Sequence, residues 1–337
     1  MVTLKDIATE AGVSMMTVSN VINKNYGRVS EKNIEKINEL IKKYNYVPNL
    51  SARSLSSKSS KIIVIFLPKD DPLVNYFSNP YMGELFGEIE TLIRKNNYFV
   101  LIRSLEEVGS ISTVLKNWNA DGAIVLTHLD NSTVKMIAGS SECPVVFIDS
   151  YVEGDSSALT VGINDYKGGY TAAKHLIHNG HTKIAFAGPY NESNEIVYNR
   201  YRGYCAALEE AAIKTSTIIK TNTTYEDGIQ VGKAIANKFY DVTAVFATAD
   251  ILAIGIMEGA HRNGMIVPND LSVVGFDNLQ ICSFASPKLT TISQNVKQKA
   301  ECSVNLLMRA IDDSSFRRKA VALDVELKER QSVKMLK

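Results

Sequence analysis

The sequence has few cysteines, no long apolar run and almost no net charge, and each absence excludes a class of protein. Its four cysteines lie far apart without a CxxC pair, which disfavours a disulfide framework or a structural zinc site and suits a reducing cytoplasm. The longest apolar run, Ile62 to Pro68, is much shorter than the roughly 18 residues of a membrane span. The N-terminus lacks the charged and then apolar pattern of a secretory signal. These features predict a cytoplasmic protein without a membrane partner.

Signatures of enzymes are also missing. The chain contains no phosphate-binding GxxxxGKS or GxxxxGKT sequence, no GxSxG elbow and no glycines spaced as GxGxxG. His175, His178 and His181 are spaced as HxxHxxH, but Gly180 is expected to end the helix before the third histidine, which disfavours a metal site. We therefore predict no enzyme activity, no cofactor and no bound metal.

The net charge of +1 conceals two segments of opposite sign. Residues 1–61 hold ten Lys and Arg against five Asp and Glu, so this segment carries +5. The other 276 residues hold 27 basic and 31 acidic groups and carry −4. A basic N-terminal segment on a mildly acidic body indicates that only the first segment faces an anionic partner such as nucleic acid.

The N-terminal segment has the pattern of a helix, a glycine turn and a second helix. Thr3 and Asp6 have capping-box spacing at the start of the first helix, and Gly12 suits the left-handed position at its end. Ser14 is placed to cap the second helix. A third helix begins at Ser30 and is predicted to stop at Pro48.

The second helix carries unusually polar and flexible residues on its outer side. In a helix-turn-helix, the first residues of the second helix reach base edges in the major groove. Met15 and Met16 offer apolar contacts there, and Asn20 can pair with adenine. Hydroxyl and amide side chains suit phosphates. A three-helix domain with a solvated face, or one that contacts proteins, is the alternative. The predicted DNA-contacting residues of this domain are Thr3, Ser14, Met15, Met16, Thr17, Ser19, Asn20 and Asn23.

Residues 47–60 read as a short helix followed by a serine-rich linker. Asn49 is placed to cap the helix, which is so short that it needs a second copy and DNA to become ordered. Leu55 would then be an apolar wedge for a minor-groove base step. The predicted DNA contacts of this segment are Asn49, Ala52, Arg53 and Leu55.

The remaining residues alternate strands and helices, which predicts an α/β fold of two doubly wound parallel sheets. Two halves, near 61–161 and 162–291, fit the length. Strands are expected at 62–67, 98–102, 123–126, 145–148, 159–163, 184–187, 245–248, 272–276 and 320–327, and helices at 83–96, 168–179, 199–212, 227–239, 250–263 and 296–311.

Polar and aromatic side chains follow several of these strands, where ligands bind in such folds. Carboxylates, amides and guanidinium groups suit paired hydroxyls, and aromatic rings suit the apolar face of a sugar. Each also has a structural interpretation, because Asp at a strand end often caps a helix and Arg200 can bridge the two halves. The candidate effector-binding residues are Tyr81, Met82, Asn164, Asp165, Arg200, Asp250 and Asp277.

Several of these motifs together resemble the lac repressor family of bacterial transcription regulators, over essentially the whole chain. The N-terminal motif carries most of the resemblance, and shorter motifs follow in the family's order. The matching residues are Thr3-Leu4-x-Asp6-Ile7-Ala8-x-x-Ala11-Gly12-Val13-Ser14-x-x-Thr17-Val18-Ser19-x-x-Ile22-Asn23, Asn49-x-x-Ala52-Arg53-x-Leu55, Asn79-Pro80-Tyr81, Gly180-His181-x-x-Ile184-Ala185, Arg200-x-x-Gly203-Tyr204, Val274-Gly275-Phe276-Asp277 and Leu289-Thr290-Thr291-Ile292.

The resemblance implies a homodimeric repressor that binds a pseudo-palindromic operator. It implies a helix-turn-helix domain (1–46), a hinge helix and linker (47–60), and a periplasmic-binding-protein-like core. In that core, residues 292–327 return to the first half, so that 61–161 with 292–327 form one subdomain and 162–291 the other. A small molecule bound between the subdomains would control operator affinity. Arg200 and Asp277 match the family's effector contacts.

The chain departs from the family at several effector positions. It has Asn164-Asp165 where the family usually has Asp-Asn, Ala249 where Asn or Ser is frequent, and Met82 in place of a frequent aromatic residue. We therefore predict only the class of the effector, a carbohydrate that is either a sugar or a sugar phosphate. A purine and a co-repressor protein are the alternatives.

Overall fold

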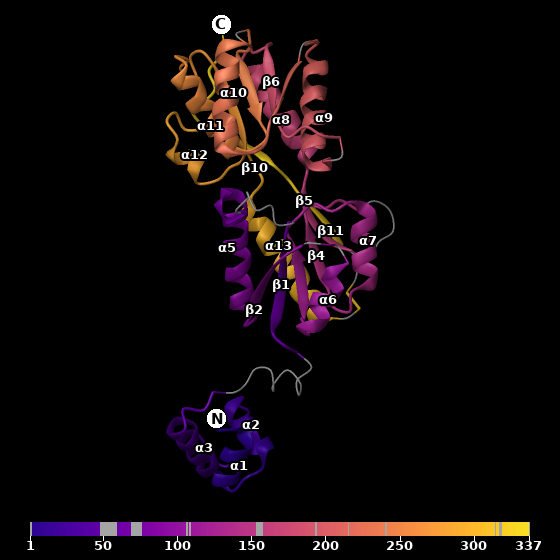
Figure 1. The fold of residues 1–337 in the computed structure, drawn as a ribbon, viewed down its shortest axis with the longest axis vertical. Coiled ribbons are helices and arrows are strands. Elements are labelled where there is room, and N and C mark those ends of the chain that lie inside the picture. Colours follow the sequence, from indigo (N-terminus) through magenta and orange to yellow (C-terminus); the bar gives the residue numbers. More distant parts are fainter. Residues whose placement is uncertain are drawn as a thin grey trace. The chain divides into compact units, whose positions relative to one another are not determined.

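The computed structural model describes residues 2–47, 59–68, 76–105, 107, 109–152, 158–192, 194–214, 216–239, 241–313, 315–316 and 319–336. Two compact units make up the chain, Met1–Ser60 and Lys61–Lys337 (Figure 1). Among the described residues, no helix is both long and apolar enough to cross a bilayer.

Three α-helices form the first unit, and their ends follow the predicted capping signals. The Thr3 hydroxyl and the Asp6 carboxylate form the full capping box of α1, and Gly12 ends this helix with a φ of +72°. Ser14 caps α2 by accepting from the Thr17 amide. The elements are α1 (Leu4–Ala11), α2 (Met15–Ile22), the 3-10 turn η1 (Tyr26–Arg28) and α3 (Glu31–Lys43), and their buried core is Ile7, Ala8, Ala11, Val18, Val21, Ile37 and Leu40.

The end of α3 differs from the prediction. The helix stops at Lys43, well before Pro48. Asn45 adopts a left-handed conformation with a φ of +45°, and the Tyr46 amide donates back to the Ile41 carbonyl at 2.9 Å. Asparagine is one of the few side chains that tolerates this conformation, so Asn45 ends the helix.

Two six-stranded sheets form the second unit. Their orders are β11-β5-β4-β3-β1-β2 and β12-β10-β9-β8-β6-β7, and every neighbouring pair is parallel except β10 with β12. The strands are β1 (Ile62–Leu67), β2 (Phe99–Ser104), β3 (Gly122–Val125), β4 (Val145–Ile148), β5 (Leu159–Ile163), β6 (Ile184–Gly188), β7 (Ser216–Lys220), β8 (Ala244–Ala247), β9 (Ser272–Asp277), β10 (Thr290–Ser293), β11 (Lys319–Leu323) and β12 (Glu326–Lys328).

Helices cover both faces of each sheet, as a doubly wound fold requires. On the first sheet, α5 and α13 share one core while α6 and α7 share another, and β1 contributes alternate residues to the two. On the second sheet, α8 and α9 pack on one face, and α10 and α11 on the other. The helices are α5 (Pro80–Lys95), α6 (Ser110–Asn117), α7 (Asn131–Ser140), α8 (Asp165–His178), α9 (Glu195–Glu210), α10 (Tyr225–Asn237), α11 (Asp250–Arg262), α12 (Ile281–Phe284) and α13 (Val296–Asp312), with a 3-10 turn η2 (Tyr76–Ser78).

The chain crosses between the sheets three times. It leaves the first sheet after β5, returns through α13 after β10, and crosses again between β11 and β12. The single strand predicted over 320–327 is therefore wrong, because β11 and β12 lie in different sheets. The subdomain limit placed at 291/292 falls inside β10, where Ile292 pairs with Phe276 in the second sheet. The alternation of apolar residues continues from β11 into β12, so the sequence pattern carries no sign of the change of sheet between them.

Besides the two 3-10 turns, five short elements were absent from the sequence interpretation: α6, α7, β7, β10 and α12. Each is short, and a short periodic segment gives a weak signal. After β12 the chain stays on the second sheet, where the Val273 amide donates to the Ser332 carbonyl at 2.8 Å.

The contact between α8 and α9 depends on glycine. A Cβ added at Gly203 would lie 1.9 Å from the carbonyl oxygen of Tyr166. We expect Gly203→Ala to lower the free energy of unfolding by about 1–3 kcal/mol, because the helices must separate. Gly139→Ala in α7 is the matched control, since its Cβ meets no atom within 4 Å. Urea unfolding of both variants measures the difference, and equal midpoints would contradict the close-packing argument.

Candidate functional site

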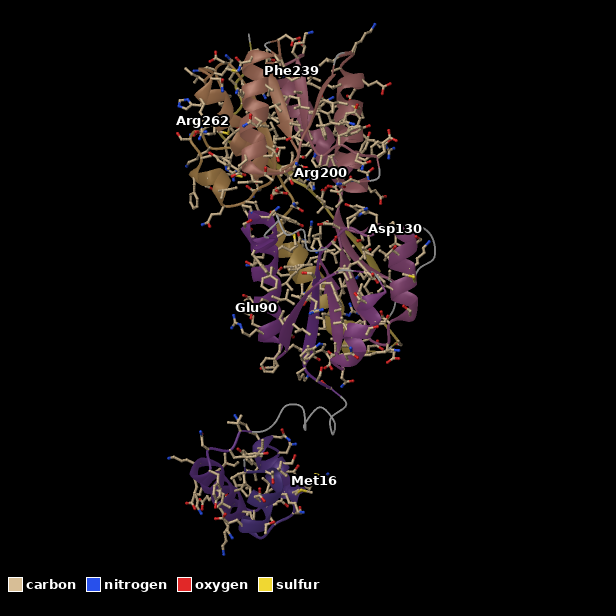
Figure 2. The ribbon with its side chains drawn as sticks, viewed as in Figure 1. Met16, Glu90, Asp130, Arg200, Phe239 and Arg262 are labelled. Atoms are coloured by element: carbon tan, nitrogen blue, oxygen red, sulfur yellow. The ribbon has the colours of Figure 1, made fainter. Side chains whose placement is uncertain are left out.

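The outer side of α2 presents the residues expected to contact DNA. Met15 and Met16 are exposed, by 53% and 70%, and Asn20 is half-buried. Figure 2 labels Met16 on this unit. The Ser14 and Thr17 hydroxyls lie 2.9 Å apart, and the Asn23 amide donates to the Ser19 hydroxyl at 3.3 Å. These pairs hold the polar side chains in place along the helix.

Thr3 is committed to the capping box, where its hydroxyl donates to the Asp6 carboxylate at 2.8 Å. The other predicted DNA contacts, Asn49, Ala52, Arg53 and Leu55, lie outside the described residues.

In the second unit, a buried lysine joins three elements at the carboxyl edge of the first sheet. Lys299, on α13, is completely buried and donates to both carboxylate oxygens of Asp149, at 2.8 and 3.0 Å. Asp149 directly follows β4, and it also accepts from the Tyr81 hydroxyl of α5 at 2.8 Å. Burial, together with the charge of Asp149, raises the pKa of Tyr81, so this hydroxyl remains a proton donor.

The same lysine continues the hydrogen-bond chain toward the second sheet. Lys299 Nζ donates to Gln294 Oε1 at 2.5 Å, and Gln294 Nε2 donates to Asp277 Oδ1 at 2.5 Å. Asp277 is the last residue of β9, with a φ of +122°. The chain Asp149–Lys299–Gln294–Asp277 therefore connects the carboxyl ends of β4 and β9, one strand from each sheet.

Arg200 forms a second buried ion pair near the carboxyl edges of the two sheets. Its Nε donates to Asp165 Oδ1 at 2.7 Å and its Nη1 to the Thr248 carbonyl at 2.7 Å. Figure 2 labels Arg200. The guanidinium group lies 3.6 Å from the centre of the Phe276 ring. Tyr151 donates a short hydrogen bond to the other oxygen of Asp165. The Phe276 ring on one face and the two hydrogen bonds at the edge fix the orientation of the guanidinium group.

Asp250, the first residue of α11, is a buried acid with neutral partners. Its oxygens accept from the Leu279 amide at 2.9 Å and from the Thr291 hydroxyl at 2.5 Å. Burial raises its pKa to about 6. Burial and then the charge of Asp250 raise the pKa of Asp277 to about 8. The two carboxyl groups are therefore close enough to influence each other.

Comparison with known proteins identifies the family. The family described as "Bacterial regulatory proteins, lacI family" matches residues 3–49, and the "Periplasmic binding protein-like domain" matches residues 173–333. The HTH-type transcriptional regulator DegA of Bacillus subtilis is 37% identical over 313 residues, covering 88% of this chain and 87% of DegA. The chain belongs to the lacI family of bacterial regulatory proteins. It is a DNA-binding transcriptional repressor and not an enzyme.

Other relatives extend the similarity over the full length. The HTH-type transcriptional repressor PurR of Histophilus somni is 31% identical over 344 residues and covers all of both chains. The lac repressor dimer bound to operator and the anti-inducer ONPF has a TM-score of 0.85 at 26% identity, with 99% of both chains covered. A LacI family regulator from Enterococcus faecium with bound ribose has a TM-score of 0.70 at 26% identity, covering 81% of this chain and 100% of that one. These matches confirm the predicted fold and family.

The predicted effector residues divide into two groups. Tyr81, Asp165, Arg200, Asp250 and Asp277 take part in the ion pairs and hydrogen bonds described above. Asn164 is exposed and caps α8 by accepting from the Lys167 amide at 2.9 Å, and Met82 packs against the core shared by α5 and α13. For these two, the structural interpretations of a helix cap and a core contact account for the contacts observed.

Sequence reasoning missed Lys299, Gln294 and Tyr151, and it passed over Asp149 when the candidates were chosen. A lysine in the middle of α13 resembles an ordinary surface residue. Its spacing was informative, because Lys299 falls three residues after Val296 and four before Ser303, both buried. A lysine on the apolar side of a helix needs a partner.

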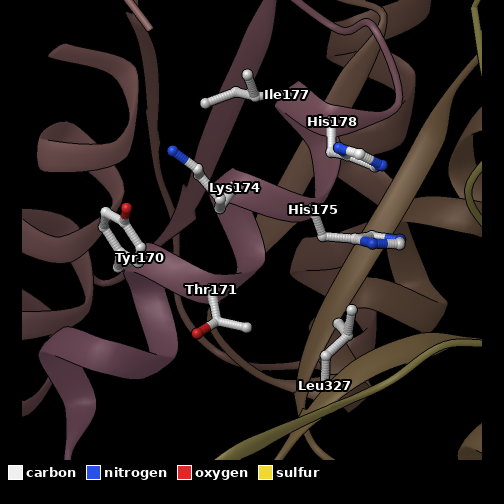
Figure 3. A pocket seen from close by; sticks show the side chains of 7 residues that line it. All are labelled: Tyr170, Thr171, Lys174, His175, Ile177, His178 and Leu327. Atoms are coloured by element: carbon white, nitrogen blue, oxygen red, sulfur yellow. The ribbon is translucent and has the colours of Figure 1, made fainter. Parts of the chain in front are cut away.

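The HxxHxxH histidines do not converge. His175 and His178 point the same way from α8 into a shallow groove with a volume of about 430 Å³ (Figure 3). His181 is buried elsewhere, against the Thr243 hydroxyl at 3.0 Å and the Lys334 carbonyl at 3.2 Å. Within the described part of the chain, no three His, Cys, Asp or Glu side chains are grouped to hold a metal. The groove is lined by Tyr170, Thr171, Lys174, His175, Ile177, His178 and Leu327.

The raised pKa of Asp277 predicts a pH dependence of stability. Between its ordinary value of 3.8 and about 8, the folded chain binds a proton at Asp277 that the unfolded chain does not, so stability falls as pH rises through this range. One such group changes the free energy of unfolding by up to about 1.4 kcal/mol per pH unit. We expect Asp277→Asn to flatten this dependence in urea unfolding between pH 5 and 8. Asp241→Asn, at an exposed acid before β8, should keep the wild-type slope. A parallel pH profile for Asp277→Asn would refute the assignment.

Proposed function

We propose that this repressor acts as a homodimer on a pseudo-palindromic operator, and that a hydroxylated small molecule of the sugar class, bound in the crevice, controls its operator affinity. The observation that carries the proposal is the hydrogen-bond chain from Asp149 through Lys299 and Gln294 to Asp277. It links residues at the carboxyl edges of both sheets, where ligands of such folds bind. A ligand that contacts one end of this series of hydrogen bonds is therefore coupled to the sheet at its other end.

The apolar surface of the first sheet supports the homodimer. β2 is an edge strand, and Phe99 and Ile102 on it are exposed by 56% and 40%. An exposed apolar edge strand is an aggregation hazard unless another surface covers it. A second copy of the chain supplies that cover and also brings two helix-turn-helix units to one operator. The lac repressor structure that resembles this chain is a dimer bound to operator.

Two candidate residues suit sugar recognition by their chemistry. Arg200 uses Nε and Nη1 in the hydrogen bonds described, which leaves further donors of its guanidinium group available for a ligand hydroxyl. Asp277 offers a carboxyl group that both accepts and donates when protonated. The Enterococcus faecium regulator that resembles this chain holds ribose.

Specific DNA recognition is tested at Asn20. This side chain makes no hydrogen bond within the described residues, so its amide is available to a base edge. We expect Asn20→Ala to reduce discrimination at one operator base pair by about 1–3 kcal/mol, because a paired hydrogen bond to adenine is lost. Competition binding with operators changed at each position measures this, and affinity for unrelated DNA should stay the same. Unchanged selectivity at every position would count against the role of Asn20.

Effector control is tested at Asp277. Fluorescence anisotropy of a labelled operator, titrated with pentoses, hexoses, their phosphates and purine bases, identifies the compound that shifts operator affinity. In Asp277→Asn that shift should disappear, while operator binding without the compound remains within about twofold of wild type. Coupling of this kind is typically worth about 1–3 kcal/mol. A full response in Asp277→Asn would place the effector elsewhere. A response to a purine base, or to none of the compounds, would favour the purine or co-repressor alternative.

A further inference from the structure

The proposed effector site contains a cluster of charged groups that we define as four acids and two bases: Asp149, Asp165, Asp250, Asp277, Arg200 and Lys299. Hydrogen bonds and chain neighbours place these groups together. Asp149, Lys299 and Asp277 are joined through Gln294, and Arg200 contacts both Phe276, next to Asp277, and the Thr248 carbonyl, two residues before Asp250. The charges of Asp149 and Asp277 both raise the pKa of Tyr81, and the charges of Arg200 and Lys299 both act to lower that of Asp277. The cluster therefore spans both sheets and forms one electrostatic environment.

Both bases of the cluster are already neutralised by the protein. Lys299 is bound to Asp149 and is completely buried, so its ammonium group has no freedom to turn toward a ligand. Arg200 is bound to Asp165 at 2.7 Å, with both side chains nearly buried. Each positive charge is thus compensated by its own carboxylate before any ligand arrives.

The other two acids have no such compensation. Asp277 accepts from the amide of Gln294, and Asp250 accepts from a backbone amide and the Thr291 hydroxyl, all of which are neutral. Among the described residues, no salt bridge is formed by either acid. At neutral pH Asp250, whose pKa is about 6, is mostly ionised, whereas Asp277, whose pKa is about 8, mostly keeps its proton, so the excess negative charge of the cluster rests mainly on Asp250.

We propose that this crevice selects a neutral or positively charged polyhydroxylated ligand and rejects its phosphorylated or carboxylated counterpart, and that the Asp149–Lys299 pair determines this selectivity. The inference rests on the proposed effector site and narrows it, because a sugar phosphate was one of the predicted effectors. An anionic ligand would meet the uncompensated charge of Asp250 in a medium of low dielectric constant, where repulsion is strong. A hydroxyl group instead donates to Asp277 and accepts from Arg200 without any change in charge.

One substitution can convert the Asp149–Lys299 ion pair, which has no net charge, into a group with a net positive charge. Asp149→Asn keeps the size of the side chain and one oxygen that accepts from Lys299 and Tyr81, but it removes the charge that neutralises the lysine. The crevice then gains a positive charge at a fixed position. Asp241→Asn removes one acid near the amino end of β8, at the opposite edge of the sheet, and is the matched control.

The test is isothermal titration of the full-length protein with matched ligands. The hexose set is glucose, glucosamine, glucuronate and glucose 6-phosphate, and the pentose set is ribose and ribose 5-phosphate. We expect a neutral or amino sugar to bind at least about tenfold more tightly than the anionic member of its set. In Asp149→Asn this ratio should shrink by about tenfold, whereas in Asp241→Asn it should remain as in the wild type.

Several outcomes would overturn the inference, and the first needs no variant. If a phosphate ester or glucuronate binds the wild type as tightly as its parent sugar, the charge argument fails. If the preference for neutral over anionic sugars is unchanged in a folded Asp149→Asn protein, the Asp149–Lys299 pair does not determine it. If a purine base binds and no sugar does, the proposed polyhydroxylated ligand class is wrong. Operator binding is measured on the same preparations. An anionic sugar that binds and shifts operator affinity would leave the proposed function intact while refuting this inference, and loss of specific operator binding would refute the proposed function itself.

Discussion

The buried ammonium group of Lys299 is the constraint on which the crevice depends. A lysine with no exposure to water is stable in its charged form only when its hydrogen bonds are satisfied and a counter-charge is close. Here Asp149, Tyr81 and Gln294 provide these partners, and each comes from a different part of the chain. The requirement of one side chain thus determines the relative positions of the start of α5, the end of β4 and the segment before α13.

The second ion pair has a different character. Arg200 lies flat on Phe276 and is held by the Asp165 carboxylate and the Thr248 carbonyl, so it belongs mainly to the second sheet. Tyr151 ties Asp165 to the first sheet, because its hydroxyl also donates to the Ile163 carbonyl at 3.1 Å. The two halves therefore meet through these polar contacts, which are directional and can exchange partners, and also share a buried apolar core with residues from both sheets, such as Ile65 and Phe276.

Local signals in the sequence predicted local features well. The capping box at Thr3, the turn at Gly12 and the cap at Ser14 all depend on residues within a few positions of one another, and the alternation of strands and helices revealed the doubly wound class. Features that depend on distant partners were harder to predict. The change of sheet between β11 and β12 leaves no mark on the apolar pattern, and the role of Lys299 requires Asp149, which lies 150 residues earlier. The end of α3 before Asn45 was not predicted, because Pro48 was interpreted as the stop signal.

The three crossings between the sheets limit how the two halves can move. Separate connections at three places prevent the halves from sliding freely, so rotation about an axis near the connections is the motion that distorts the chain least. Asp165 and Gln294 each lie within two residues of a crossing strand end. Contacts made there act close to that axis, where a small local displacement corresponds to a large swing of the far ends of both halves. The contacts made by Asp165 and Gln294 are thus placed where a small displacement changes the relative orientation of the two halves most.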